Sequence, residues 1–582
     1  MRFLLDLKLL FLFLFISFCH VHGQISDTVF RRPLDLPVSL SGNFAELRAN
    51  HLHSGIDYRT QGVAGHKVYA SERGYVSRIS ISPTGYGNAI YIAHPNGYTT
   101  VYGHLDAFND VITAYVKQQQ YRQERFSVNL YIDSTLLKVK RGDVIAFSGN
   151  TGGSSGPHLH FEVRDTKTEK TINPLQFGFG VKDNIAPVIQ RLAVYPAGEG
   201  SRVNGSANKL ILDLEKSGNN YRLAGGVKLK IEGMAAFGID AHDQLSGSTN
   251  RCGPYSIQLY VDGDLMFSQT MNSFSFDESR YINSMIDYEY YINNRIRFNR
   301  MFIEPNNQLS VYDRHINRGI VAFPNSANHT ALVMVSDFHG NSSQLNFSFE
   351  YTPGKSTTSI AAYIPEIEII PQKSRNYQRE FKHEQQGIRI VIPADALYDN
   401  INFTCVATVV PKGLFSKAYK IHDPGTPLHK AMTIEIAADN LPERLREKAL
   451  LVQIDPVSGR RSSAGGEYRN GAVYGSSGVF GTFAIGVDTV PPRITSINLK
   501  NGANMSAVKN MRFKITDDFS GIATYNGWID GQWALFQYDA KNDLLYYDFD
   551  ADRLNKNAQH TLELKVTDNK RNTTEYKASF FW

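Results

Sequence analysis

Hydrophobic and polar residues alternate in short runs along most of the chain, and turn-forming residues separate these runs. Between residues 40 and 180 the runs are Lys67–Ala70, Tyr75–Ile81, Ala89–Ala93, Tyr98–Tyr102 and Val144–Phe147. Alternation with a period of two is typical of β-strands. Pro95-Asn96-Gly97, between two of the runs, predicts a hairpin turn. We therefore expect an antiparallel β domain in residues 24–182, after a short lead-in.

One segment of this domain breaks the strand pattern. Residues 107–137 contain a polar, glutamine-rich stretch from Asp110 to Phe126 that is compatible with a helix. We interpret residues 107–137 as an inserted helix and loop, which could cover a groove, confer specificity or hold a regulator.

Three short motifs recur in the same order later in the chain. They are Asp183-Asn-Ile-Ala-Pro187 with Asp488-Thr-Val-Pro-Pro492, Asp243-Gln-Leu-Ser-Gly247 with Asp517-Asp-Phe-Ser-Gly521, and Val335-Ser-Asp337 plus Asn341 with Val566-Thr-Asp568 plus Asn572. Ordered matches predict two copies of one immunoglobulin-like β-sandwich, at residues 183–352 and 488–582. The first copy is longer and carries an insertion near 275–316. The aspartates could indicate calcium, but we favour Asx-type turns that cap strand ends.

The chain between the two copies divides into a linker and another domain. Residues 353–384 are rich in Pro, Ser, Thr and Lys and are predicted to be a linker. Residues 385–487 show strand patterns at 387–392 and 432–436 and a Gly/Ser/Tyr hairpin region at 465–481. The fold class is therefore mainly β.

Composition and charge narrow the class of protein. The chain has 582 residues, 42% of them hydrophobic and 12% aromatic, which is typical of a globular protein with several domains. The formal net charge of +5 falls to about +4 without residues 1–23, and we find no dense Lys/Arg tract, so we expect no nucleic-acid partner. Cys252 and Cys405 lie 153 residues apart, and we expect them to be unpaired.

The N-terminus has the pattern of a secretory signal. Arg2 and Lys8 precede an apolar run from Leu9 to Phe18, and Gly23 ends the segment. We predict that residues 1–23 are a signal peptide, with a short membrane anchor as the alternative. We expect no membrane span in the mature chain.

The strongest chemical signal is a glycine-rich turn, residues 148–157, that leads into His158-Leu159-His160. In an extended strand, residues two apart point to the same side, so both imidazoles would face one cleft. His53 and Asp57 share a side by the same argument. Together with one histidine of the 158/160 pair they predict a His/Asp/His metal site with an open position for water.

These residues resemble a known family. His53-x-x-x-Asp57, Tyr102-Gly-His104, Gly149-Asn-Thr-Gly152 and His158-Leu-His160-Phe-Glu162, with Asn173-Pro-Leu near the end, resemble the lysostaphin/LytM-type zinc endopeptidases of peptidase family M23. The resemblance covers about residues 40–180. It implies an antiparallel sheet with a groove for an extended peptide.

The resemblance also implies roles for single residues. His53, Asp57 and His160 would be the ligands of Zn²⁺. His104 and His158 would be the family's unligated pair, which activates water, stabilises the oxyanion and passes a proton to the leaving amine. Other histidines are expected to be structural: His94 before the hairpin turn, His66 and His242. His51 could compete as a ligand, and we expect it at the rim of the groove.

The implied function is a secreted zinc endopeptidase that hydrolyses the peptide cross-links of peptidoglycan, in a bacterial periplasm or at the cell surface. Two alternatives belong to other classes: a catalytically idle scaffold that activates other wall hydrolases, and an adhesin that binds the wall through its sandwiches. All five polar positions are intact, which favours the enzyme. The insert and the C-terminal modules are candidate docking sites for a regulatory protein.

Overall fold

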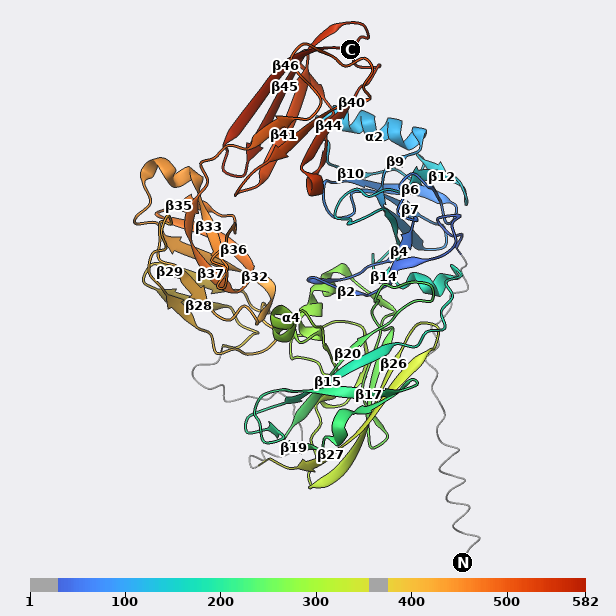
Figure 1. The fold of residues 1–582 in the computed structure, drawn as a ribbon, viewed down its shortest axis with the longest axis vertical. Coiled ribbons are helices and arrows are strands. Elements are labelled where there is room, and N and C mark those ends of the chain that lie inside the picture. Colours follow the sequence, from blue (N-terminus) through green and yellow to red (C-terminus); the bar gives the residue numbers. More distant parts are fainter. Residues whose placement is uncertain (1–29, 355–374) are drawn as a thin grey trace, which may run out of the picture. The chain divides into compact units, whose positions relative to one another are not determined.

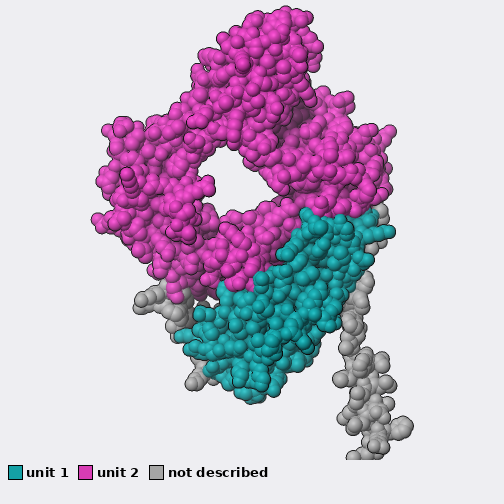
Figure 2. Space-filling view, in the orientation of Figure 1, with its two compact units in different colours: residues 1–29, 175–272, 311–357 teal, residues 30–174, 273–310, 358–582 magenta. Residues whose placement is uncertain are grey.

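The computed structural model describes residues 30–354 and 375–582, and Figure 1 shows these as coloured ribbon. The expected signal peptide therefore lies outside the described residues, as does most of the expected 353–384 linker. The chain divides into two compact units, coloured separately in Figure 2. Unit 1 contains residues 175–272 and 311–357. Unit 2 contains residues 30–174, 273–310 and 358–582.

The first β domain of unit 2 is built on one antiparallel sheet. The strand order is β1 (Leu40–Gly42), β4 (Ile56–Arg59), β13 (His158–Asp165), β8 (Tyr98–Leu105), β7 (Asn88–Ala93), β6 (Gly74–Ile81) and β10 (Val128–Tyr131). The short strands β11 (Lys138–Val139) and β14 (Thr171–Ile172) pair with β6 and β13. The side chains of Ile56, Tyr102, Leu159 and Phe161 are fully buried, so the central strands hold the core. The mainly β, antiparallel fold predicted from the alternation is confirmed.

Smaller elements complete this domain. A second sheet joins β5 (Lys67–Tyr69), β12 (Val144–Phe147) and β9 (Ala107–Phe108), and β2 (Leu47–Arg48) pairs with β3 (His51–Leu52). Within the expected insert, helix α2 spans Asp110–Gln123. Asn109 caps it by accepting a hydrogen bond from Ile112 N, as expected for an N-cap asparagine.

Unit 1 contains a large mixed sheet. The strands on its path are β20 (Ala235–His242), β15 (Val188–Pro196), β17 (Leu210–Ser217), β18 (Asn220–Leu223), β27 (Ser342–Thr352), β26 (Ala327–Ser336), β21 (Ser256–Val261), β22 (Asp264–Thr270) and β25 (Tyr312–His315). Off this path, β16 (Arg202–Val203) pairs with β19 (Leu229–Glu232), and β19 runs parallel to β27.

Residues 273–310 belong to unit 2. They hold β23 (Ser273–Phe274), β24 (Asn299–Arg300), α3 (Ile282–Met285) and α4 (Tyr288–Asn294). Strand β23 pairs with β14 of the first β domain, and Ser279 Oγ accepts a hydrogen bond of 2.7 Å from Leu52 N. The insertion expected near 275–316 thus packs beside the β2–β3 hairpin.

The rest of unit 2 forms two further β-rich regions. Residues 375–487 contain two five-stranded sheets: β28 (Phe381–Gln385), β29 (Ile388–Ile392), β32 (Pro427–Ala437), β36 (Ala472–Val479) and β35 (Glu467–Arg469); and β30 (Cys405–Ala407), β31 (Tyr419–Ile421), β37 (Gly481–Val487), β33 (Ala449–Ile454) and β34 (Arg461–Ser463). One apolar core joins these strands.

Residues 488–582 likewise form two sheets over one core. They are β38 (Arg493–Ser496), β40 (Asn510–Thr516), β44 (Leu544–Asp548) and β43 (Gln537–Asp539); and β39 (Ala503–Asn504), β46 (Thr573–Phe581), β45 (Gln559–Asp568), β41 (Ile522–Ile529) and β42 (Gln532–Ala534). Cys252 is buried and Cys405 is half-buried, and the two are not joined by a disulfide. Among the described residues, no helix has the length and apolar character needed to cross a membrane.

Candidate metal centre

Two neighbouring strands bring the predicted metal ligands together. His160 of β13 and Asp57 of β4 are direct partners in the antiparallel register. His53 precedes β4 in a non-strand segment, yet its Nε2 atom lies 3.1 Å from both Asp57 Oδ1 and His160 Nδ1. His160 Nδ1 is 3.0 Å from Asp57 Oδ1. The three side chains are buried and meet at one point, as the sequence pattern predicts.

The outer hydrogen bonds of the two histidines turn one ring nitrogen of each toward Asp57. His53 Nδ1 donates to Asn43 O at 2.7 Å, which leaves a lone pair on Nε2. His160 Nε2 lies 2.8 Å from Glu162 Oε1, and donation to that carboxylate leaves a lone pair on Nδ1. These two ring nitrogens and Asp57 Oδ1 therefore face one another. Burial acts to lower the pKa of His160, but Asp57 and Glu162 raise it to about 9, so His160 carries a positive charge between the two carboxylates that a bound cation would replace. Such a donor set fits a bound cation, and two histidines with one aspartate are typical ligands of Zn²⁺.

A buried network fixes the outer side of His160. Glu162 Oε1 accepts hydrogen bonds of 2.5 Å from both Tyr86 OH and Ser54 Oγ. Glu162 Oε2 lies 2.7 Å from Arg164 Nε and 2.6 Å from Arg164 Nη2. Burial alone would raise the pKa of Glu162, but Arg164 and His160 hold it well below its ordinary value. Glu162 is therefore a charged acceptor that orients His160.

The charges around Asp57 favour its ionised form. Burial alone would raise its pKa, but His53 and hydrogen bonds from His158, His160 and His53 hold the pKa well below the ordinary range. Arg48 Nη2 lies 2.7 Å from Asp57 Oδ2 and takes up the second oxygen. Asp57 thus presents Oδ1 as a carboxylate oxygen to the centre.

The second predicted pair lies beside the acceptor set. The rings of His104 and His158 are 4.7 Å apart between centroids. His104 Nδ1 donates to Thr151 O at 2.8 Å, and His158 Nδ1 lies 2.8 Å from Gly156 O. His158 Nε2 is 3.5 Å from Asp57 Oδ1. Burial and the charges of His160 and His158 lower the pKa of His104 to about 3, so its Nε2 atom is a free acceptor at neutral pH.

Glycines allow the backbone approaches that shape the centre. A Cβ atom on Gly55 would collide with Phe161 O of β13, so only glycine lets the segment between His53 and Asp57 lie against that strand. Gly152 has φ +70°, and a Cβ there would collide with the backbone of Gly87. The glycine-rich turn is thereby held against residues 84–87.

The remaining histidines lie outside the acceptor set. His51 is exposed, and its Nδ1 atom lies 2.9 Å from Ala49 O. His94 is buried between Arg73 O and Thr100 Oγ1 at 2.9 and 2.8 Å. His66 is half-buried and its Nε2 atom has no hydrogen-bond partner. His51 therefore takes no part in the observed His/Asp/His cluster.

Sequence reasoning assigned no role to several residues that support the centre. The strand period could have indicated Glu162 and Arg164, because they follow His158 and His160 at a spacing of two residues and so lie on the same side of β13. Arg48, Ser54 and Tyr86 gave no comparable signal, because their contacts depend on how separate loops fold back.

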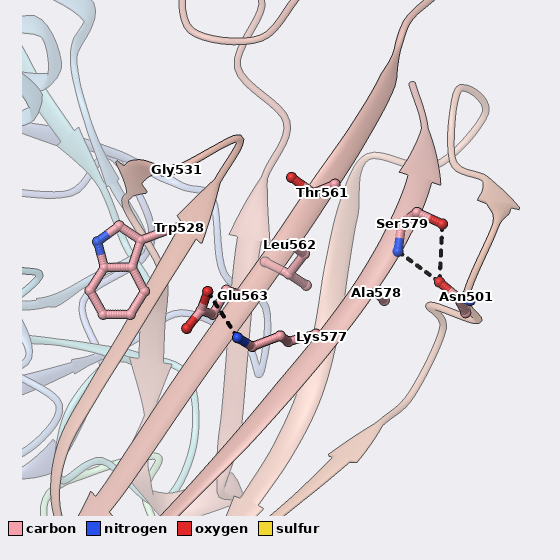
Figure 3. Close-up of a pocket in the computed structure, with 9 residues that line it drawn as sticks. All are labelled: Asn501, Trp528, Gly531, Thr561, Leu562, Glu563, Lys577, Ala578 and Ser579. Atoms are coloured by element: carbon pink, nitrogen blue, oxygen red, sulfur yellow. Dashed lines mark hydrogen bonds and ion pairs between the residues drawn. The ribbon is translucent and has the colours of Figure 1, made fainter.

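Two other features lie away from these residues. Helix α2 contacts the 488–582 region within unit 2: Tyr121 packs edge-on against Trp533 with ring centroids 5.3 Å apart. A shallow pocket on strands β41, β45 and β46 is shown in Figure 3, where Glu563 and Lys577 form an ion pair of 3.4 Å. Neither feature includes a residue of the candidate centre.

An antiparallel sheet with a buried His/Asp/His acceptor set and two further imidazoles defines a metallopeptidase type of domain. Comparison with known proteins agrees. The model of peptidase family M23 matches residues 51–121 and 130–174, and the gap between them falls in the 107–137 insert. A Zu5-like domain matches residues 372–488.

Curated relatives are similar over a minor part of this chain. The DD-carboxypeptidase/endopeptidase Mpg of Neisseria meningitidis serogroup B is 39% identical, covering 19% of this chain and 20% of the relative. The peptidoglycan DD-endopeptidase ShyA of Vibrio cholerae is 32% identical, covering 25% and 31%. The murein hydrolase activator NlpD of Escherichia coli is 34% identical, covering 22% and 26%. The chain thus spans about a fifth to a third of the length of these relatives.

Among solved structures, the catalytic domain of lysostaphin from Staphylococcus simulans aligns with 24% of this chain and 91% of its own, at 23% identity and a TM-score of 0.18. The N-terminal β domain of this chain thus belongs to peptidase family M23.

Proposed function

We propose that the chain is a zinc-dependent endopeptidase that hydrolyses peptide cross-links of peptidoglycan. The observation that carries this proposal is the convergence of three possible ligand atoms: His53 Nε2, Asp57 Oδ1 and His160 Nδ1 lie 3.0 to 3.1 Å from one another. His104 and His158 lie beside these three residues, in position to transfer protons during hydrolysis of a bound peptide.

The proposed chemistry divides between the two groups of residues. His53, Asp57 and His160 would hold Zn²⁺, which supplies Lewis acidity and lowers the pKa of water to about 7. His104 is held by Thr151 O at Nδ1, so its Nε2 atom is placed to accept a hydrogen bond from the attacking water. His158 is held by Gly156 O at Nδ1, and its Nε2 atom is placed to stabilise the oxyanion or protonate the leaving amine.

The substrate class rests on the relatives. Mpg and ShyA are named for carboxypeptidase and endopeptidase activity, and ShyA's name states peptidoglycan. We extend this substrate to the chain because the M23 model matches the domain that holds His53, Asp57 and His160. Export to a bacterial periplasm or cell surface follows from the substrate and from the signal pattern in residues 1–23.

Digestion of purified peptidoglycan tests the proposal. Zinc-loaded protein should release products whose masses show loss of a peptide cross-link, and these masses identify the bond. The matched control is His158→Ala with the same zinc content. Unchanged peptidoglycan with the zinc-loaded wild type contradicts the proposal.

One relative supports a second candidate function. NlpD is named as a murein hydrolase activator, so the domain can also belong to a protein that activates other hydrolases. If the chain is an activator, wild-type protein and the His158→Ala variant should raise the activity of a separate wall hydrolase to the same extent. A loss of that effect in His158→Ala excludes this alternative.

A further inference from the structure

The repeated aspartate motifs build a cluster in each of their two copies, away from the peptidase centre. In the first copy, Asp183, Asp337 and His339 have ligand atoms within 4.8 Å of one another. In the second copy, Asp488, Asp517 and Asp568 do the same. The motifs thus come together in space as well as in order along the chain.

The local structure of the two clusters is the same. Asn341 Nδ2 donates to Asp337 Oδ2 at 2.7 Å and to Asp183 O at 3.2 Å. Asn572 Nδ2 donates to Asp568 Oδ2 at 2.7 Å and to Asp488 O at 3.0 Å. Asx turns occur as expected, with Ile185 N donating to Asp183 Oδ1 at 3.1 Å. This turn accounts for Asp183 Oδ1, and Asn341 donates to both oxygens of Asp337, but Asp183 Oδ2 has no donor.

The first copy contains acidic oxygens without donors. Asp243 follows β20, is only 2% exposed, and its Oδ1 atom has no hydrogen-bond partner. Asp183 Oδ2 is also buried without a partner, although Asp183 Oδ1 accepts from Ser246 N and Oγ at 3.0 and 2.9 Å. Unpartnered carboxylate oxygens are costly in a protein interior, so these two atoms call for a positive ligand.

Asp243 is the counterpart of Asp517, which lies in the second cluster, so the same fold brings Asp243 to the first cluster. Burial and the negative charges of Asp337 and Asp183 raise the pKa of Asp243 to about 8. His339 Nε2 donates to Val181 O at 3.0 Å, so its Nδ1 atom keeps a lone pair. The cluster therefore collects three carboxylates and one further possible ligand atom.

The second copy is satisfied by its own groups. Asp488 accepts from Val490 N at 3.1 Å and, through Oδ2, from Ser520 N at 3.0 Å. Asp517 Oδ2 accepts from Phe519 N and Gly521 N at 3.1 and 2.7 Å.

A cationic side chain also stands at the second cluster. Lys570 occupies the position that His339 has in the first copy. Its Nζ atom donates to Gly466 O at 2.5 Å, and burial lowers its pKa against the charges of Glu467, Asp568 and Asp488. The second copy thus has donors and a lysine where the first copy has open oxygens and a histidine.

We propose that Asp183, Asp243 and Asp337 form a binding site for a divalent cation of the calcium type. Calcium takes six to eight oxygen ligands and accepts irregular geometry, which suits three carboxylates that approach from separate segments. The cation ties the segment before β15 to the ends of β20 and β26, because Asp183 precedes β15, Asp243 follows β20 and Asp337 follows β26. The second copy holds no such ion.

Calcium titration of the full chain tests this site. The protein is stripped of metal, and calcium chloride alone is added while heat of binding and the thermal unfolding midpoint are recorded. Calcium should bind the wild type and raise its midpoint. Asp243→Asn should weaken calcium binding at least about tenfold, and without metal it should unfold no earlier than wild type, since it removes a buried carboxyl whose ionisation Asp337 and Asp183 oppose.

The matched control is Asp517→Asn in the second copy, which should respond to calcium as wild type does. Asp183→Asn is a second variant of the site that keeps Oδ1 and loses Oδ2, and it decides the matter if Asp243→Asn does not fold. The proposal is overturned if calcium does not bind the wild type. It is also overturned if Asp243→Asn and Asp183→Asn both respond to calcium like wild type, or if Asp517→Asn abolishes the response.

Discussion

His160 and Asp57 face each other across the β4–β13 pair, with His160 Nδ1 3.0 Å from Asp57 Oδ1. The antiparallel register fixes this contact, because directly opposed residues in such a pair point to the same side of the sheet. His53 then needs only a short loop with Gly55 to reach the same point. The centre is therefore set mainly by the pairing of two strands.

Glu162 should control the metal affinity of the centre without touching the metal. Glu162→Gln keeps the size of the side chain but weakens the acceptor that orients His160 through Nε2. We expect zinc affinity to fall about 10- to 100-fold, measured by competition with a zinc chelator. Glu169→Gln is the control, because Glu169 also pairs with Arg164 but is 64% exposed. Equal affinities in the two variants would show that Glu162 does not orient the ligand.

Gly55 should be irreplaceable by alanine. The added Cβ would collide with Phe161 O and push the loop away from β13. We expect Gly55→Ala to destabilise the domain by about 1–3 kcal/mol, measured by thermal unfolding. Gly156→Ala is the control, because a Cβ there meets no atom within 4 Å. A Gly55→Ala protein as stable as this control would mean that the close approach is not required.

His94 should make the domain less stable in mild acid. Burial lowers its pKa below the ordinary value, so the unfolded chain binds its proton at higher pH than the folded chain does. The stabilisation is present above about pH 6.5 and is lost as pH falls toward the folded pKa, with a slope of at most about 1.4 kcal/mol per pH unit.

Scanning calorimetry over this pH range can measure the effect, following the transition that zinc shifts. His94→Gln keeps a donor and an acceptor for Arg73 O and Thr100 Oγ1 but cannot titrate. Its stability should depend less on pH than that of wild type. Identical pH profiles would assign the acid sensitivity to other groups.

The strands were largely predictable because one side of each is buried. The run Val144–Phe147 matches β12, and the Pro95-Asn96-Gly97 turn joins β7 to β8 as expected. The end of β8 was not predictable: the strand continues to Leu105, and His104 within it has a φ of +58°, which side-chain pattern does not reveal.

The part of the candidate centre that lies on strand β13 was predictable from the alternation of side chains along a strand. His158 and His160 lie on one side of β13 because they are two residues apart, and Glu162 continues that row. The choice between His158 and His160 as ligand depended on family resemblance, since the period treats them alike. Arg48 was out of reach, because its contact with Asp57 follows from the β2–β3 hairpin folding back over β4.

For the aspartate motifs, the sequence predicted the local turns but not the contacts between the motifs. Their sequence favoured simple turns, and the turn at Asp183 is present. The burial of Asp243 and its unpartnered oxygen depend on the packing of three separate segments, which a local pattern does not encode.

Zinc content and cleavage measured on the same samples test the central claim most directly. Wild type, His160→Ala and His158→Ala are each loaded with zinc, assayed for bound metal, and incubated with cross-linked muropeptides. The account predicts zinc and cleavage in wild type, loss of both in His160→Ala, and retained zinc with lost cleavage in His158→Ala. Cleavage by His160→Ala at the wild-type rate would contradict it.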